Sequence, residues 1–197
     1  MPGHLIAFEG LDQSGKQTQA ERLADTLRTA GHQVELVSFP DYTTPIGTEI
    51  DRALAGAREF PADVMQLLYI ANRYEYRARI SQWLSAGTLV VCDRYLASSI
   101  AYGEAHGLDA TWLAETQRHL PQPSLTLLLD IAPETSLERK QAARDRYERD
   151  LALLARVRES YLRQSAAATW VCLDGRHDRD LVTTTIETAV RTRLGLR

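Results

Sequence analysis

The fold is decided near the N-terminus by the stretch LIAFEGLDQSGKQTQ, residues 5–19. Its first four residues are apolar and predict a buried strand, whereas the residues from Lys16 onward have helical periodicity. Between them two glycines flank four residues and a lysine follows, which is the spacing of a phosphate-binding P-loop. Backbone N–H groups of such a loop, the positive end of the following helix dipole and the lysine all bind phosphate oxygens. The predicted phosphate-binding residues are Gly10, Leu11, Asp12, Gln13, Ser14, Gly15, Lys16, Gln17 and Thr18.

The lysine of this loop is one of only two in the chain. Of the 23 basic residues, only Lys16 and Lys140 are lysines and the others are arginines. A slender ammonium group fits between phosphates better than the wide guanidinium fork. The use of a rare lysine at this position therefore supports a phosphate-binding role.

A magnesium site is less clearly marked. The position after the lysine usually holds a hydroxyl residue for Mg²⁺, but here it is Gln17, followed by Thr18. Adjacent residues differ by about 100° around a helix, so Thr18 is no simple replacement. The ion can be held by the Gln17 carbonyl oxygen, by water, or chiefly by a carboxylate elsewhere. Asp93 is the candidate, because it follows an apolar strand at the edge where ligands of α/β sheets bind, although such an aspartate is often a helix N-cap.

The composition is that of an ordinary globular protein, with 44% hydrophobic residues, 25% charged residues and a net charge of −3. This balance excludes a disordered chain, and the lack of a basic field argues against a nucleic-acid partner. No run approaches the roughly 20 apolar residues of a membrane span, and the first apolar run is too short for a signal peptide. We therefore expect a cytoplasmic protein without a membrane partner. Cys92 and Cys172 lie in apolar runs and are predicted to be buried thiols.

Short apolar runs alternate with helical stretches along the chain, as in an α/β fold with a parallel sheet. No repeat or linker interrupts the pattern, so we predict one domain over residues 1–197, with a five-stranded parallel sheet and helices on both faces. The predicted strands are 5–8, 34–39, 88–92, 125–131 and 170–173, and the predicted helices include 16–30, 46–55, 62–85 and 179–193. A buried face is predicted on helix 62–85, formed by Val64, Leu67, Leu68, Ala71, Tyr74, Trp83 and Leu84.

Three arginine-containing segments are candidates for binding anions. Tyr69 and Arg73 share a face of the long helix, where they can stack on a base and bind a phosphate. The alternative, which residue statistics favour, is a core tyrosine and an arginine in a surface ion pair. Arg94 directly follows Asp93 and can hold a transferring phosphoryl group. Residues 138–149 contain five positive and three negative side chains, which fits either a solvated helix face or an arginine-rich lid over residues 138–150.

Taken together and in this order, these segments resemble the thymidylate kinase family. The resemblance covers essentially the whole chain. It rests on Phe8–Asp12, Gly15–Lys16, Phe39-Pro40, Ala71-Asn72-Arg73 and Asp93-Arg94-Tyr95, with Ser98, Ala101 and Tyr102 behind them. The P-loop alone is generic, but its combination with Asn72-Arg73 and Asp93-Arg94-Tyr95 is specific.

The resemblance implies a P-loop nucleoside-monophosphate kinase that uses Mg²⁺, transfers the γ-phosphoryl group of ATP to dTMP, and is usually a homodimer. It implies that Tyr69 stacks on thymine and that Arg73 contacts the base or the acceptor phosphate. Arg94 would contact phosphates near the transfer point, and Asp12 would lie near the acceptor's sugar and phosphate. Tyr102 would crowd the C2′ position and disfavour ribonucleotides.

On the donor side, the resemblance places Arg139 over adenine and the loop containing Arg176 at the other face of the base. The catalytic residues it implies are Lys16, Asp12, Arg94, Arg139 and Arg146. Further acceptor-binding residues are Phe39, Pro40, Asn72, Ser98 and Tyr147.

Two residues depart from the pattern of some family members. Gln13 replaces a catalytic arginine in the P-loop, so the role would pass to the lid, where Arg139, Arg144, Arg146 and Arg149 are available. Tyr42 replaces an arginine for the acceptor phosphate, which places more weight on Arg73 and Arg94.

Other functions remain open from the residues. One is a kinase of another nucleotide, or of a deoxynucleoside, which would need a carboxylate base. Another is a catalytically idle nucleotide-binding scaffold, suggested by Gln17. A switch GTPase is not expected, because the sequence lacks an Asn-Lys-x-Asp motif.

Overall fold

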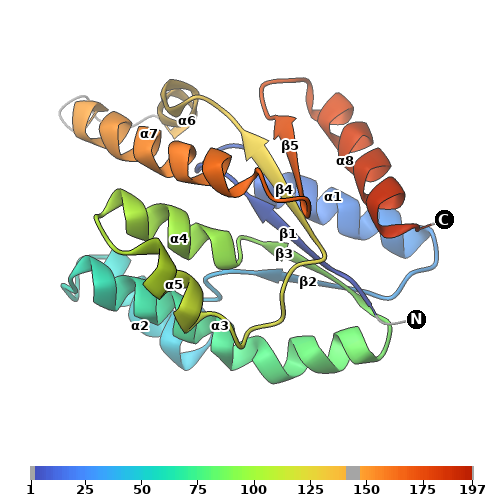
Figure 1. Ribbon diagram of the computed structural model, residues 1–197, viewed down its shortest axis with the longest axis horizontal. Helices are drawn as coiled ribbons and strands as arrows, with labels where there is room; N and C mark the ends of the chain where they lie inside the picture. Colours follow the sequence, from blue (N-terminus) through green and yellow to red (C-terminus); the bar gives the residue numbers. More distant parts are fainter. Residues whose placement is uncertain (1–2, 141–146, 197) are drawn as a thin grey trace.

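The computed structural model describes residues 3–140 and 147–196, and for residues 140 and 147–150 it describes the backbone. Five strands form one parallel sheet in the order β2-β3-β1-β4-β5 (Figure 1). The strands are β1 (Leu5–Glu9), β2 (Val34–Ser38), β3 (Leu89–Asp93), β4 (Leu125–Asp130) and β5 (Trp170–Asp174). The helices are α1 (Lys16–Thr29), α2 (Pro45–Leu54), α3 (Ala62–Ser85), α4 (Leu96–Ala105), α5 (Ala110–Thr116), α6 (Pro133–Lys140), α7 (Tyr147–Gln164) and α8 (Arg179–Leu194). The predicted five-stranded parallel sheet with helices on both faces is confirmed.

Alternation along the central strand divides the core between the two faces of the sheet. Ile6 and Phe8 of β1 pack in the cluster that contains residues of α1 and α8. Leu5 and Ala7 point to the opposite face, where Ile80 of α3 lies. Helices α4 and α7 pack together in a third cluster, which lies on the same side of the sheet as α3. The sheet is therefore covered on both faces, as expected for parallel strands.

The topology brings the two strongest motifs together. Strands β1 and β3 are parallel neighbours, and Phe8 pairs with Asp93 in their register. The P-loop leaves the end of β1 and Arg94 leaves the end of β3, so both begin at the same edge of the sheet. This is the edge at which ligands of open α/β sheets bind.

The buried face predicted for α3 is wrong in the first half of the helix. Leu67 is 42% exposed, and its apolar neighbours on this side are only partly buried: Val64, Leu68 and Ala71. Farther along the helix, Tyr74, Trp83 and Leu84 pack against the core as predicted. The inward positions of the first half include the polar residues Gln66, Asn72 and Arg73. They point inward because this side of α3 borders a pocket and a loop that both require hydrogen-bonding groups.

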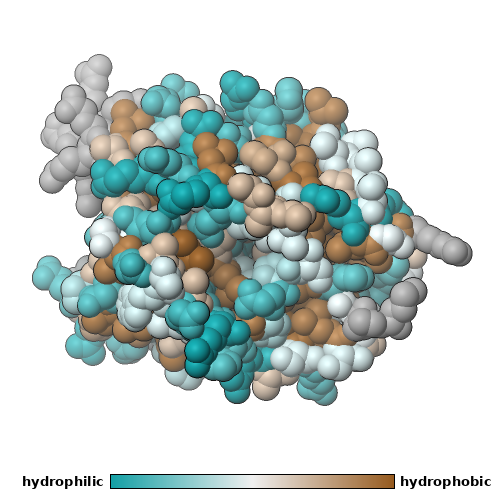
Figure 2. Space-filling view, in the orientation of Figure 1, coloured by the Kyte–Doolittle hydropathy of each residue, from teal (hydrophilic) through white to brown (hydrophobic). Residues whose placement is uncertain are grey.

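The cysteine prediction is half right. Cys92 is buried in β3, and burial raises the pKa of its thiol. Cys172 is exposed because it lies in β5, an edge strand with a neighbour on only one side. In Figure 2, hydrophilic side chains are interspersed with apolar ones across the face shown. Within residues 3–140 and 147–196, no helix combines the length and the apolar character needed to cross a bilayer.

Candidate active site

The P-loop curls tightly between β1 and α1. Gly10 has a φ of 139°, and a Cβ atom there would lie 2.5 Å from the carbonyl oxygen of Leu129. Only glycine fits this position, which satisfies one requirement of the predicted motif. Gly15 and Gln13 also have positive φ angles, of 93° and 60°. The loop therefore turns its backbone inward at the start of α1.

Lys16 lies inside this curl. Its Nζ donates a hydrogen bond to the Leu11 carbonyl oxygen at 2.7 Å and lies 3.4 Å from Ser14 Oγ. The residue is only 6% exposed. Burial, followed by repulsion from Arg94, lowers the pKa of Lys16 to about 7. The site thus holds an ammonium group whose charge would be stabilised by an anion bound in the loop.

Arg94 lies beside the P-loop in a strained conformation. Its φ is 62°, which is uncommon for a residue other than glycine and is concentrated at functional sites. Its Nη2 donates to Asp12 Oδ1 at 2.5 Å, and its guanidinium carbon lies 5.4 Å from the centre of the Tyr102 ring. Burial disfavours the charge, but Tyr102, Tyr161 and Asp12 hold the pKa of Arg94 well above its ordinary value. Arg94 is therefore a fixed positive charge.

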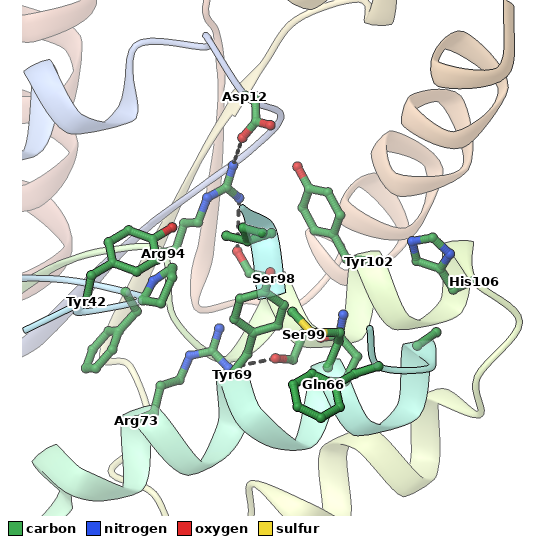
Figure 3. Close-up of a pocket in the computed structure, with 16 residues that line it drawn as sticks. Asp12, Tyr42, Gln66, Tyr69, Arg73, Arg94, Ser98, Ser99, Tyr102 and His106 are labelled. Carbon is green, nitrogen blue, oxygen red and sulfur yellow. Dashed lines mark hydrogen bonds and ion pairs between the residues drawn. The ribbon is translucent and has the colours of Figure 1, made fainter. Parts of the chain in front are cut away.

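A cavity of about 570 Å³ opens next to this arginine, with residues of α3 and α4 in its lining (Figure 3). It brings together most of the acceptor-site residues predicted from the sequence: Asp12, Phe39, Pro40, Tyr69, Arg73, Arg94, Ser98 and Tyr102. Tyr42 also lines it. Burial raises the pKa of Tyr69 to about 12, so its ring remains neutral at ordinary pH.

Two guanidinium groups line the cavity. Arg94 lies beside Asp12 and the P-loop, and Arg73 lies farther from the P-loop, beside Ser99 (Figure 3). Arg73 is 3% exposed, and its Nη1 donates to Ser99 Oγ at 2.6 Å and to Gln117 Oε1 at 3.3 Å. Burial lowers the pKa of Arg73. Among the described residues it forms no ion pair with a carboxylate, so the surface ion pair considered for it is wrong.

Asn72 does not line the cavity, so its predicted contact with the acceptor must be corrected. Its amide nitrogen donates to the Asp41 carbonyl oxygen, Thr44 Oγ1 and Glu75 Oε2, and its Oδ1 accepts from the Asp41 N–H. The two amide hydrogens are shared among these three acceptors, so none is left for a ligand. Asn72 instead holds the loop that carries Phe39, Pro40 and Tyr42 against α3.

Asp93 has the character of a cation-binding carboxylate. Burial raises its pKa, although nearby Lys16 and Arg94 oppose the shift. Its Oδ1 is buried and has no hydrogen-bond partner within the described chain. In contrast, Gln17 is exposed and donates to Glu21 Oε1 at 3.0 Å, and Thr18 is exposed as well. Mg²⁺ commonly uses one or two carboxylates together with substrate phosphates, so Asp93 fits such an ion.

The predicted donor-side residues lie around the P-loop. Arg139 Nη1 donates to the Gln13 carbonyl oxygen at 2.9 Å, and Ser136 Oγ donates to the Asp12 carbonyl oxygen at 2.8 Å. Side chains from the middle and the last turn of α6 therefore attach this helix to the loop. Arg176 forms an exposed ion pair with Asp174, at 2.7 Å. The lid residues Arg144 and Arg146 lie outside the described residues, as do the side chains of Tyr147 and Arg149.

Three polar cavity residues were not predicted from the sequence: Gln66, Ser99 and His106. Gln66 is 4% exposed, and its Oε1 has no partner among the residues described. It precedes Tyr69 by three residues and Arg73 by seven, so helical spacing could have placed it on their face. Ser99 directly follows Ser98 on α4, and His106 lies just past the end of that helix. No motif marks either of them.

Comparisons with known proteins agree with this geometry. The family model for thymidylate kinase matches residues 8–186. A thymidylate kinase of Schizosaccharomyces pombe is 40% identical over 147 residues, covering 75% of this chain and 70% of that protein. A thymidylate kinase of Dictyostelium discoideum is 31% identical over 185 residues, covering 93% and 83%.

A solved structure of thymidylate kinase from Candida albicans superposes on this fold with a TM-score of 0.81 at 31% identity. The match covers 100% of this chain and 94% of that one. Family model, sequence relatives and fold all agree with the resemblance noted from the motifs. The chain belongs to the thymidylate kinase family of ATP-dependent nucleoside-monophosphate kinases.

Proposed function

We propose that this chain transfers the γ-phosphoryl group of ATP to dTMP, giving dTDP and ADP. The observation that carries the proposal is the cavity beside the P-loop, whose lining includes Arg94 next to the P-loop and Arg73 beside Ser99. A nucleoside monophosphate offers a partner to each arginine, because it has a phosphate at one end and a base with polar groups at the other. The aromatic rings of Tyr69 and Tyr102 also line the cavity.

The donor is held by the P-loop. Its backbone N–H groups and Lys16 bind the β- and γ-phosphates, because this turn leads directly into the N-terminus of α1 at the edge of the sheet where ligands bind. Arg139 contacts the P-loop backbone and lies at the donor side, and Arg176 borders the adenine.

The acceptor lies in the cavity with its phosphate toward Arg94 and its base toward Arg73. In this orientation Tyr69 stacks on the base, and Tyr102 limits the room at C2′, which favours a deoxyribose. Asp12 orients Arg94 through their ion pair. Phe39, Pro40 and Ser98 complete the walls.

The reaction requires positioning and charge compensation more than covalent help. The phosphate of dTMP is already anionic and is itself the nucleophile, so no general base is needed. Arg94 stabilises the negative charge of the transferred group from the acceptor side. Arg139 and Arg146 are the lid arginines to which we assign the same role from the donor side.

Magnesium fits the site through Asp93, whose buried Oδ1 lacks a hydrogen-bond partner among the described residues. When bound, the ion neutralises charge on the β- and γ-phosphates. We assign the main protein contact to Asp93, because it is a carboxylate with a buried oxygen that lacks a protein partner among the described residues, whereas Gln17 is exposed and its side chain is bonded to Glu21.

We also propose that residues 1–197 act as one kinase domain, that the protein is cytoplasmic, and that it forms a homodimer. The support for the dimer is the outward side of α3. Leu67 is 42% exposed there, and the apolar side chains around it are only partly buried. A second copy packed on this side would bury the stripe that the sequence predicts to be buried.

The direct test is a coupled assay of ADP release with ATP and a panel of nucleoside monophosphates and nucleosides. We expect dTMP to be the best acceptor and thymidine to be inactive. Preference for thymidine would indicate a nucleoside kinase instead. Binding of ATP with no ADP release from any acceptor would indicate an idle nucleotide-binding protein.

A further inference from the structure

The carboxylate of Glu9 caps a helix from outside that helix. Glu9 is the last residue of β1 and is fully buried. Its Oε1 accepts the backbone N–H groups of Tyr95 and Ser98 at 2.9 and 3.3 Å, at the N-terminus of α4. The local N-cap residue, Tyr95, makes no side-chain cap. Glu9 therefore fixes the start of α4, directly after Arg94.

The second carboxylate oxygen of Glu9 accepts hydrogen bonds from two hydroxyl groups. Glu9 Oε2 accepts from Ser98 Oγ at 2.6 Å and from Tyr161 Oη at 3.1 Å, and the two hydroxyl oxygens are 2.8 Å apart. Tyr161 comes from α7, far along the chain, and is 1% exposed. Burial and the charge of Glu9 raise the pKa of Tyr161, so the hydroxyl keeps its proton.

Arg94 donates into the same cluster. Its Nη1 lies 3.2 Å from Ser98 Oγ, 3.3 Å from Tyr161 Oη and 3.2 Å from the Gly10 carbonyl oxygen. Each hydroxyl has one proton to give. The hydroxyl oxygens of Ser98 and Tyr161 both accept from Arg94. Their own protons are therefore donated to the carboxylate of Glu9, either directly or through the other hydroxyl group. By accepting these protons, Glu9 turns the hydroxyl lone pairs toward the guanidinium.

We propose that Tyr161 and Glu9 are positioning residues that orient the guanidinium of Arg94 for phosphoryl transfer. The inference rests on the proposed function insofar as Arg94 acts on the acceptor phosphate. Neither residue lines the cavity, so both act through Arg94. The Asp12 ion pair fixes Nη2, and the hydroxyl pair fixes Nη1. Because both terminal nitrogens are held in place, the guanidinium needs little reorientation when negative charge develops on the transferred phosphoryl group.

The first test is Tyr161→Phe in the full chain, which removes one hydroxyl and keeps the ring. We expect kcat with dTMP to fall about tenfold, because small misplacements of a catalytic group are costly, while KM for ATP stays unchanged. Tyr95→Phe is the matched control. Tyr95 is equally buried, but its hydroxyl has no hydrogen-bond partner in the described part of the chain. We expect this variant to keep wild-type kcat.

A double-mutant cycle shows whether Tyr161 acts through Arg94. We expect Tyr161→Phe to cause no further loss of kcat/KM in an Arg94→Ala background, since the group it orients is gone. A merely structural hydroxyl would cost the same factor in both backgrounds. Glu9→Gln is an independent route, because its NH₂ group would face the hydroxyls and turn a proton toward Arg94. It should lower the same Arg94-dependent activity.

The position of the guanidinium can be read without turnover. In ¹H–¹⁵N NMR of the ligand-free protein, we expect resolved Arg94 Nη resonances in wild type and Tyr95→Phe, and averaged ones in Tyr161→Phe. The inference is overturned if Tyr161→Phe leaves both kcat and these resonances as in wild type, or if its loss is undiminished in Arg94→Ala. An inactive wild-type protein would instead refute the proposed function, and the NMR comparison would still decide the role of Tyr161.

Discussion

Binding of ATP should weaken steeply as the pH rises above neutrality, because Lys16 must be protonated to bind phosphate. The ammonium group is buried in the P-loop and its pKa is lowered to about 7 in the ligand-free protein. Phosphate oxygens stabilise the charged form and return the pKa toward its ordinary value of 10.5. Binding therefore takes up a proton when the ligand-free lysine is neutral.

The size of the effect follows from the fraction of protonated Lys16. With a pKa of about 7, roughly a quarter of the molecules are protonated at pH 7.5 and about 3% at pH 8.5, so affinity falls about eightfold over this unit. Stability of the ligand-free protein has the opposite sign. The unfolded chain binds the lysine proton more tightly than the folded chain, so the contribution of Lys16 to stability rises with pH between about 7 and 10.5.

The assay is isothermal titration calorimetry with ATP at constant free Mg²⁺, in two buffers of different ionisation enthalpy. ATP itself is fully ionised over this pH range. We expect uptake of about 0.8 proton per nucleotide at pH 7.5 and nearly one at pH 8.5. Lys16→Ala should bind more weakly without proton uptake, and its turnover should fall by at least about 10²-fold.

One outcome would refute this reasoning. If the affinity changed less than about twofold between pH 7.5 and 8.5, with no proton uptake, Lys16 would not be the phosphate ligand of the loop. Retention of near wild-type turnover by Lys16→Ala would lead to the same conclusion.

Three further predictions concern the acceptor, the metal and the assembly. Arg73→Met should raise KM for dTMP at least about tenfold and leave KM for ATP unchanged, since a buried charged donor is lost. The control is Arg77→Met, at an exposed position of the same helix, which should change neither KM. Asp93→Asn should raise the Mg²⁺ concentration for half-maximal rate, and an unchanged requirement would remove Asp93 from the metal site. Leu67→Arg should give monomers in light scattering, while Leu162→Arg, similarly exposed, should leave the dimer intact.

The strands and the P-loop could be predicted because their signals are local. A largely apolar run such as 125–130 is enough on its own to predict a buried strand. The glycine spacing of the P-loop reflects a backbone requirement at Gly10, where a side chain does not fit. Arg94 and Asp93 were placed correctly for a related reason. The end of an apolar strand marks the edge of the sheet where a ligand can bind.

The first half of α3 could not be predicted, because its inward positions are polar. Gln66 and Arg73 are buried to serve a cavity formed with α4, and the periodicity of one helix contains no information about that neighbour. Asn72 was assigned to the acceptor for the same lack of tertiary information. The role of Tyr161 could not be predicted from the residues around it in the sequence. Its hydroxyl group contacts Glu9 of β1 and Ser98 of α4, which come close to α7 only in the folded structure.

The most direct test of the central claim is a crystal structure with ADP and dTMP bound together. We predict the β-phosphate of ADP on the P-loop amides and Lys16, the dTMP phosphate at Arg94, and the thymine ring on Tyr69 with its polar edge toward Arg73. A dTMP molecule bound outside this cavity, or bound in reverse with its phosphate at Arg73, would contradict the account.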